Sequence, residues 1–190
     1  MPMLAAAGFA LLVVLAVVGF MILATYNDVI ALIQRVDKAW ANIDVALKQR
    51  HDMLPNLVAA VRDVMAFEQS VLEDVTRLRN AYDPARPVPE QGALSAETSL
   101  AVRSLLAVVE NYPALRSGGN VASLQAEIER LEGVIADRRE LYNDQVYRLN
   151  TRIGQVPAIL LTGLFDWRAR DFFAAPDADR ARPDVSLGTA

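Results

Sequence analysis

The sequence predicts an all-α protein in which a single N-terminal transmembrane helix is followed by an antiparallel, up-and-down helical bundle. Three features predict it: a charge-free amino-terminal stretch, apolar residues at helical spacing along most of the remaining chain, and short connections rich in proline or glycine. Four bundle helices are preferred, and three long helices are the alternative if Pro55 only kinks the first of them.

The amino-terminal stretch is the expected membrane anchor. All 19 basic and 23 acidic residues of the 190-residue chain lie from Asp28 onward. Residues 4–24 are uncharged and span roughly 32 Å as a helix, close to the thickness of a bilayer core. A cleaved signal peptide is the rival interpretation, but no basic residue precedes the apolar run. We therefore expect an anchor over residues 1–25 that contacts membrane lipid through residues 4–24, a bundle over residues 26–173 and a flexible tail over residues 174–190.

Composition excludes several classes of function. The chain has no cysteine and a single histidine, His51. A disulfide framework, a thiolate zinc site and a catalytic cysteine are therefore excluded. The net charge of −4 and the pI of about 5.0 provide no basic face for a nucleic acid. We expect no catalytic residue, no metal and no cofactor.

The first helical stretch of the bundle has its apolar residues at steps of four and three, the spacing of a helix seam. Pro55 interrupts the stretch, because proline cannot donate a backbone hydrogen bond and disfavours helical geometry at Leu54. Arg50, His51 and Asp52 suit a short turn before Pro55, so we prefer a turn there and keep a kink as the alternative. The seam residues are Val29, Ile33, Val36, Trp40, Ile43, Leu47, Leu54, Leu57, Val61, Val64, Val71, Val75, Leu78 and Tyr82.

Two more long helices are expected. Residues 83–92 contain three prolines and a glycine, which predicts a loop. Ser95 is the expected cap of a helix that runs to Tyr112, and Gly118 and Gly119 lie in the connection after it. The last long helix is expected from about Val121 to Val156, and a short apolar piece follows at residues 158–165. The inward positions are Leu94, Ala101, Leu105, Val108 and Tyr112, then Leu124, Ile128, Leu131, Ile135, Tyr142, Val146, Leu149 and Ile153.

Specific motifs resemble the LemA family of bacterial membrane proteins. They begin with Tyr26-Asn27, continue through residues 36–58, and include the mid-chain run at residues 110–115. Further matches lie in the last long helix, in the segment after it and near the end of the chain; they are Arg139, Tyr142, Asn143, Val146, Asn150, Val156-Pro157, Leu164-Phe165, Phe172-Phe173 and residues 183–187.

The resemblance implies one membrane helix and an antiparallel bundle, with no catalytic residue and no established biochemical activity to carry over. The chain departs from the family at Leu149, where the family usually has tyrosine, and at Val156 and Leu187, where it usually has phenylalanine. These departures weaken the expectation that an aromatic cluster at the bundle base forms a binding site.

Two polar pairs are candidates for chemistry. His51 beside Asp52 has the form of a base with its orienting acid, although a polar turn before Pro55 is the preferred interpretation. Arg50 and Glu68 both interrupt the seam with charge. They form either a buried ion pair that fixes register or exposed ends of the bundle.

Three further motifs lie outside these pairs. Asn143 and Asn150 are seven residues apart and share a helix face, where they bind a peptide backbone or ligand, or fix bundle register. No Lys-Ser pair follows Gly118-Gly119, so no phosphate loop is expected. The terminal Pro183-x-Val185-x-Leu187 motif has the form of a strand that adds to a partner's sheet edge.

We interpret the chain as a membrane-anchored scaffold or adaptor that binds unidentified proteins, without enzymatic activity. One alternative is a structural protein that self-associates as a homo-oligomer. The other is a hydrolase that uses His51 and nearby carboxylates. Exposure of His51 in a concave pocket would favour the enzyme, and an uncovered apolar patch would favour the scaffold.

Orientation in the membrane gives the first testable prediction. Lys and Arg within about 15 to 20 residues of a membrane helix are retained in the cytoplasm. None precedes Leu4, whereas Arg35 and Lys38 follow Ala24. The bundle should therefore be cytoplasmic, with the amino terminus outside. Protease added to intact spheroplasts should leave the bundle whole until the membrane is opened, and immediate digestion from outside would contradict the orientation.

Overall fold

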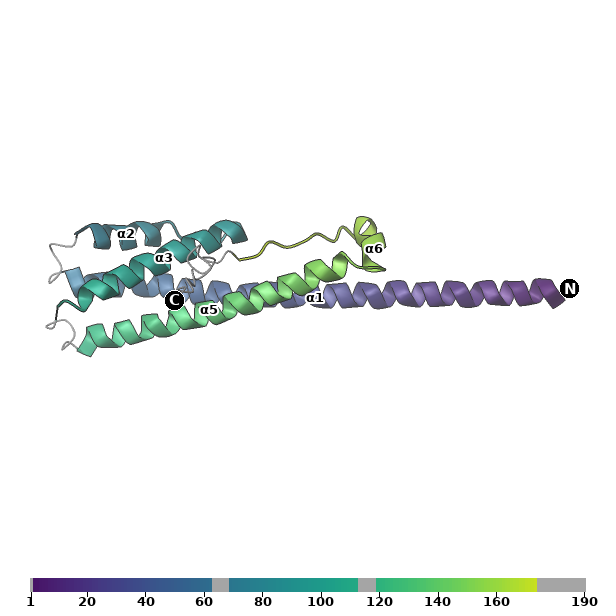
Figure 1. Ribbon diagram of the computed structural model, residues 1–190, viewed down its shortest axis with the longest axis horizontal. Coiled ribbons are helices and arrows are strands. Elements are labelled where there is room, and N and C mark those ends of the chain that lie inside the picture. The colour runs from purple at the N-terminus through teal and green to yellow at the C-terminus, as the bar shows by residue number, and fades with distance from the viewer. Residues whose placement is uncertain (1, 63–68, 113–118, 174–190) are drawn as a thin grey trace, which may run out of the picture. The chain divides into compact units, whose positions relative to one another are not determined.

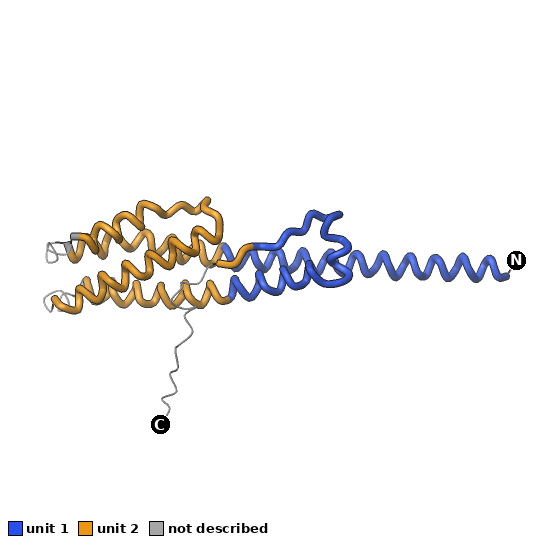
Figure 2. The backbone as a smooth tube through the Cα atoms, turned by 45° about the horizontal axis from the view of Figure 1, so that its top comes forward, with its two compact units in different colours: residues 1–40, 141–170 blue, residues 41–140, 171–190 orange. Residues whose placement is uncertain are grey.

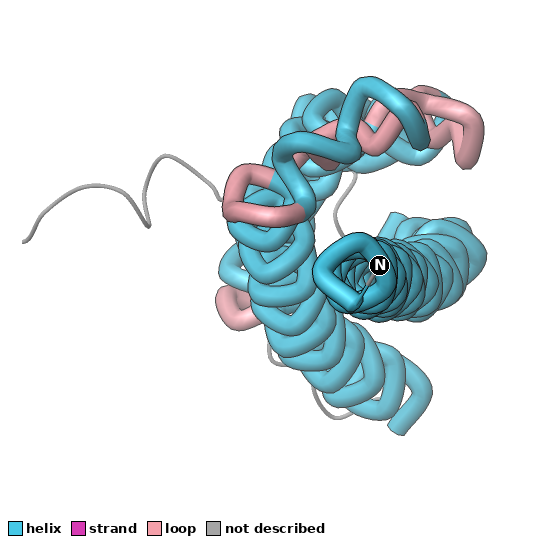
Figure 3. The backbone as a smooth tube through the Cα atoms, turned by 90° about the vertical axis from the view of Figure 1, so that its right-hand side faces the viewer, coloured by secondary structure: helices cyan, strands magenta, loops and turns pink. Residues whose placement is uncertain are grey.

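The computed structural model describes residues 2–62, 69–112 and 119–173. They form five helices, and the described residues contain no strand (Figures 1 and 3). The predicted all-α class is confirmed. The helices are α1 (Pro2–Arg62), α2 (Gln69–Asn80), α3 (Val88–Val109), α5 (Gly119–Ile153) and α6 (Ala158–Phe165).

The chain divides into two compact units, coloured separately in Figure 2. Unit 1 contains residues 1–40 and 141–170, and unit 2 contains residues 41–140 and 171–190. Helices α1 and α5 each supply residues to both units. The two units are described separately below.

Unit 2 is the antiparallel bundle. The carboxyl-terminal part of α1, then α2, α3 and the amino-terminal part of α5 run in alternating directions (Figure 1). The predicted antiparallel helical bundle is confirmed, and its helix count is roughly that of the four-helix prediction, although the helices divide at other residues. Its core consists of Leu54, Leu57, Val58, Val61, Val75, Val102, Leu105, Val109, Val121 and Ile128.

The preferred turn at Pro55 is wrong. Pro55 lies inside α1, which continues to Arg62. An internal proline costs a helix about 3 kcal/mol. Leu54, Leu57 and Val61 on either side of it are fully buried, and burying each such side chain contributes about 1.5–3 kcal/mol. Continuing the buried face across Pro55 therefore outweighs the lost hydrogen bond, and α1 runs on to Arg62.

The expected start of the next helix is also wrong. Helix α3 begins at Val88, with Pro87 at its amino-terminal cap. Proline suits the first turn of a helix, whose amide groups have no partner inside the helix, so the Pro-Val-Pro sequence starts the helix instead of prolonging the loop. Ser95 is consequently not a cap but a buried residue in the second turn of α3.

The apolar seams are largely confirmed. On α1, Val29, Val36 and Ile43 are buried, while Ile33 and Trp40 are half-buried. On α5, all predicted inward residues are buried except the half-buried Leu124. On α3, the most buried valines are Val102 and Val109, one residue beyond the predicted Ala101 and Val108. Val64 lies outside the described residues.

Unit 1 contains the amino-terminal part of α1, the carboxyl-terminal part of α5, and α6. Apart from Gly19 and Ile22, described residues up to Leu23 are exposed. Among the residues that the structure describes, two helices are long and apolar enough to cross a membrane. The first covers Pro2–Val61, with a mean hydropathy of 2.8 and none of its most apolar window buried. The second is α3, with a mean hydropathy of 1.3, but α3 contributes core residues to unit 2.

Substitution of Trp40 tests how α1 packs against α5 in unit 1. Its ring lies 5.7 Å from the ring of Tyr142 on α5. Trp40→Ala should lower the free energy of unfolding by about 3 kcal/mol, the low end for truncation of a large aromatic, because the ring is half-buried. His51→Ala should cost about 1 kcal/mol, since it removes mainly one aromatic contact. Denaturant unfolding of the full chain in detergent measures both, and equally small effects would contradict the seam assignment.

Candidate functional site

The most unusual group in unit 2 is the buried guanidinium of Arg50. Its side chain is only 4% exposed. Nη1 donates to Glu132 Oε1 at 2.8 Å and to Ser99 Oγ at 2.9 Å, and Nη2 donates to Ser95 Oγ at 3.0 Å. Ser99 Oγ also lies 2.5 Å from Glu132 Oε2. One arginine thereby joins α1, α3 and α5.

The local sequence explains this arrangement. Ser95 and Ser99 are four residues apart on α3 and therefore lie on one face of the helix. Their small side chains leave room for the guanidinium, which needs acceptors at both terminal nitrogens. Glu132 supplies the opposite charge from α5. Because Glu132 is 18% exposed, the carboxylate end of the pair reaches toward solvent while the guanidinium does not.

The described part of unit 2 contains two cavities of similar size, one of which borders this ion pair. A cavity of about 150 Å³ is bordered by Ser95, Ser99 and Glu132 and by the charged residues Arg103 and Arg139, with Phe173 at its wall. A second, of about 150 Å³, lies beside Pro55 between α1 and α2. Both are smaller than the roughly 300–1,000 Å³ of usual small-molecule pockets.

The side chains of His51 and Asp52 contact different partners. The His51 ring packs against the Tyr82 ring with 4.8 Å between centroids. Asp52 instead accepts a hydrogen bond from Lys48 Nζ at 2.8 Å on the exposed face of α1. The cavity beside His51 measures about 20 Å³, room for about one water molecule and not for an organic substrate.

The electrostatics around His51 follow from burial. Burial lowers the pKa of His51, and the charges of Arg79 and Lys48 lower it further against the opposing effect of Asp52. The histidine is therefore mostly neutral at neutral pH. Burial, together with the charge of Asp44 and a hydrogen bond to it, raises the pKa of Tyr82 to about 12. Tyr82 Oη donates to Asp44 Oδ1 at 3.2 Å, so both rings serve packing.

Asn150 binds a peptide backbone, and that backbone belongs to the chain itself. In unit 1, Asn150 Nδ2 donates to the Arg170 carbonyl and the Arg170 amide donates to Asn150 Oδ1, both at 2.9 Å. Asn150 thereby holds the segment that follows α6. Asn143 lies seven residues before Asn150 on the same face of α5, and it is half-buried.

Several predicted positions are not placed. Glu68, Gly118 and the Pro183-x-Val185-x-Leu187 motif lie outside the described residues. Within residues 2–62, 69–112 and 119–173, no group of three or more His, Asp or Glu side chains could hold a metal ion.

An aromatic cluster in unit 1 was not expected from the sequence. The Phe165 and Trp167 rings stack at 5.1 Å, and the Tyr26 ring lies 5.0 Å from Phe165 and 6.1 Å from Trp167. The cluster joins α1, immediately after the apolar segment, to the end of α6. The signal was available in the sequence, since Tyr26 ends the apolar run and two aromatic residues end the later apolar piece.

The Arg50 pair yields a prediction with a matched control. Glu132→Ala leaves a guanidinium buried without its counter-charge, which should cost about 3–5 kcal/mol in the free energy of unfolding. Arg50→Met should cost less, because the remaining carboxylate reaches solvent. Lys48 and Asp52 form a pair at the same 2.8 Å but with both side chains more than half exposed, so Asp52→Ala should change stability little.

Denaturant unfolding of the three variants measures the difference. If Glu132→Ala lowered the free energy of unfolding no more than Asp52→Ala does, Glu132 would not be what stabilises the buried charge of Arg50.

Comparison with known proteins identifies the family. The sequence profile of the LemA family matches residues 39–187. Two relatives are Magnetosome protein MamQ 2 and Magnetosome protein MamQ 1 of Paramagnetospirillum magneticum (strain ATCC 700264 / AMB-1). Each is 25% identical over 188 aligned residues, which cover 84% of this chain and 69% of the relative. The matched profile and the helical bundle together show that the chain belongs to the LemA family and is a membrane-associated helical protein of that type.

Proposed function

We propose that this protein is a single-pass, membrane-anchored scaffold whose bundle binds other proteins at the cytoplasmic face of the membrane. The observation that carries the proposal is the composition of α1. Its residues 2–23 carry no charge and are almost wholly exposed, and the same helix supplies Leu54, Leu57 and Val61 to the core of unit 2. A partner bound to the bundle is therefore attached to the membrane through one uninterrupted helix.

The polar groups of unit 2 support a binding role over catalysis. Arg50 and Glu132 neutralise each other, and His51 packs against Tyr82 beside a cavity too small for a substrate. The names of the two MamQ relatives assign them to the magnetosome and to no reaction. Both facts favour a protein that acts through its surface.

Exposed apolar side chains provide that surface. In unit 2, Val45 on α1 and Leu100 on α3 are each more than half exposed. We place the contacts with a partner at these two positions, because the buried centre of a protein interface is depleted of charged residues. Self-association through the same positions is the alternative function, because a homo-oligomer would also cover them.

Site-specific photo-crosslinking tests the proposal. A photoreactive amino acid replaces Leu100, which faces away from the core of unit 2. Irradiation in native membranes should attach one defined partner protein, and excess purified wild-type chain should compete that product away. The control places the same group at Leu11, which is equally apolar and similarly exposed in the anchor and should attach to lipid.

The products separate the two functions. A partner product at Leu100 but not at Leu11 supports the scaffold. Crosslinks at Leu100 to the protein itself alone would overturn it in favour of self-association. If neither Leu100 nor Val45 gave a crosslink to any protein, these positions would not lie on a partner-binding surface and the scaffold proposal would be wrong.

A further inference from the structure

Helix α6 exposes an unusual amount of apolar surface. In unit 1, Leu160 is 77% exposed, Leu164 is 75% exposed and Val156, just before the helix, is 74% exposed. Leu160 and Leu164 are four residues apart and share one helix face, and Ile159, at the edge of that face, is also exposed. An apolar face of this kind is costly in water and indicates an uncovered contact surface.

The opposite face of α6 packs against the protein. Ala158 is fully buried, and Leu161 and Phe165 are partly buried. No charged residue occurs between Arg152 and Asp166. The helix is therefore apolar on both faces, unlike a surface helix of a soluble protein, whose outer face is polar.

The place where α6 meets α1 indicates what covers the outer face of α6. The Phe165 ring lies 5.0 Å from Tyr26, and Tyr26 follows directly after the apolar segment that ends at Ala24. Within unit 1, α6 thus lies beside α1 where the membrane-spanning segment ends (Figure 1). Burial on α1 begins at Gly19 and Ile22, inside the apolar segment.

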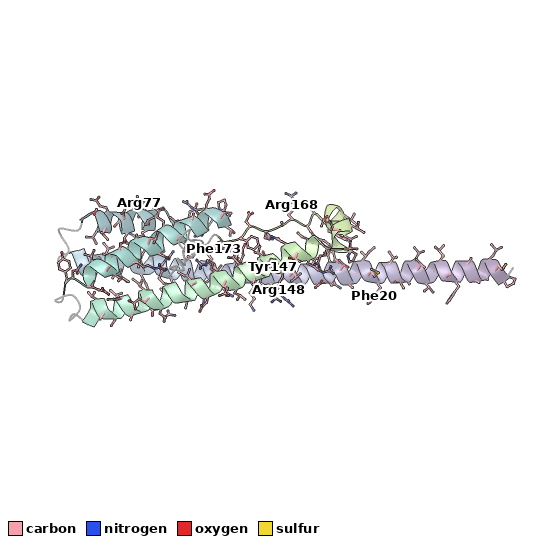
Figure 4. The ribbon with its side chains drawn as sticks, viewed as in Figure 1. Phe20, Arg77, Tyr147, Arg148, Arg168 and Phe173 are labelled. Carbon is pink, nitrogen blue, oxygen red and sulfur yellow. The ribbon has the colours of Figure 1, made fainter. Side chains whose placement is uncertain are left out.

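The residues around α6 suit a membrane interface. Aromatic rings concentrate at the boundary between hydrocarbon and water, and Tyr26, Phe165 and Trp167 form such a cluster. Arg168 follows the helix, pairs with the similarly exposed Asp166 at 3.0 Å, and projects away from the helices (Figure 4). Basic side chains beside an apolar helix reach the headgroups while the helix contacts acyl chains.

We propose that α6 is a second membrane contact, an interfacial helix that inserts Ile159, Leu160 and Leu164 into the leaflet beside the carboxyl-terminal end of the anchor. The proposal rests on the membrane anchoring described above and adds a second lipid-binding element to it. The helix is about 12 Å long, so it lies within one leaflet. The occupant of its exposed face is lipid, and no protein partner is required there.

The absence of cysteine from the chain makes a labelling experiment direct. Single substitutions Leu160→Cys and Leu164→Cys are coupled to an environment-sensitive fluorophore in the full-length chain. Labelled protein is reconstituted in phosphatidylcholine vesicles with and without phosphatidylcholine that carries a nitroxide on the upper part of its acyl chain. Phe20→Cys, exposed in the apolar segment (Figure 4), is the positive control.

Leu141→Cys is the negative control. Leu141 is an exposed leucine of α5 in unit 1, and it lies about 18 Å of helix before Ile153. The labels at Leu160, Leu164 and Phe20 should lose most of their emission to the nitroxide lipid, while the label at Leu141 keeps its emission. The two α6 labels should also emit at shorter wavelength than the Leu141 label.

The other outcomes are equally definite. If Phe20 is quenched but Leu160 and Leu164 match Leu141, the interfacial helix is wrong and the anchor stands. If none is quenched, the anchor itself fails. If the α6 labels are shielded from both lipid and water-soluble quenchers, and unlabelled Leu160→Cys forms a disulfide dimer, a second copy covers α6 and the lipid proposal is wrong.

Discussion

The buried charge of Arg50 constrains unit 2 more than any other group. A guanidinium in a protein core must be paired and hydrogen-bonded, because an unpaired buried charge costs several kcal/mol. Ser95 and Ser99 on α3 and Glu132 on α5 meet that requirement together. A slide of either helix by one turn, about 5.4 Å, would separate the guanidinium from these acceptors. The apolar residues of the core tolerate such slides far better, so the polar contacts select one register among several that hydrophobic packing allows.

The same constraint explains the unusual inner face of α3. Its first half buries Gln91, Ser95 and Thr98, and its second half buries Val102, Leu105 and Val109. The polar half of α3 lies beside Arg50, and the apolar half completes the core of unit 2. Apolar periodicity alone places the seam on Leu94, Ala101 and Val108. It considers only apolar residues and therefore overlooks the buried serine and threonine of the inner face.

Much of the fold follows from the sequence, and the reasons for the failures are physical. Charge-free length and helical spacing predict the anchor segment, the all-α class and the buried residues of α1 and α5. The turn at Pro55 is wrong because it follows from the local effect of proline on a helix alone. The burial of Leu54 and Leu57 on either side of the proline favours a continuous helix. Glu132 was missed as the partner of Arg50, since pairing between residues 82 positions apart depends on helix register, which no local pattern contains. The aromatic residues Tyr26, Phe165 and Trp167 are visible in the sequence at the ends of two apolar segments, but their contact depends in the same way on where α6 lies beside α1.

The two hydrogen bonds between Asn150 and Arg170 have a consequence for how this protein can vary. The amide side chain of Asn150 pairs with the carbonyl and the amide of residue 170, groups that every amino acid except proline possesses. These two bonds therefore do not depend on which side chain residue 170 carries, and the exposed ion pair of Arg170 with Asp37, at 3.4 Å, adds little to them. Charge can be added, removed or reversed there during evolution without releasing the segment after α6, so the electrostatics of this region can be adjusted to different surroundings while its backbone stays in place.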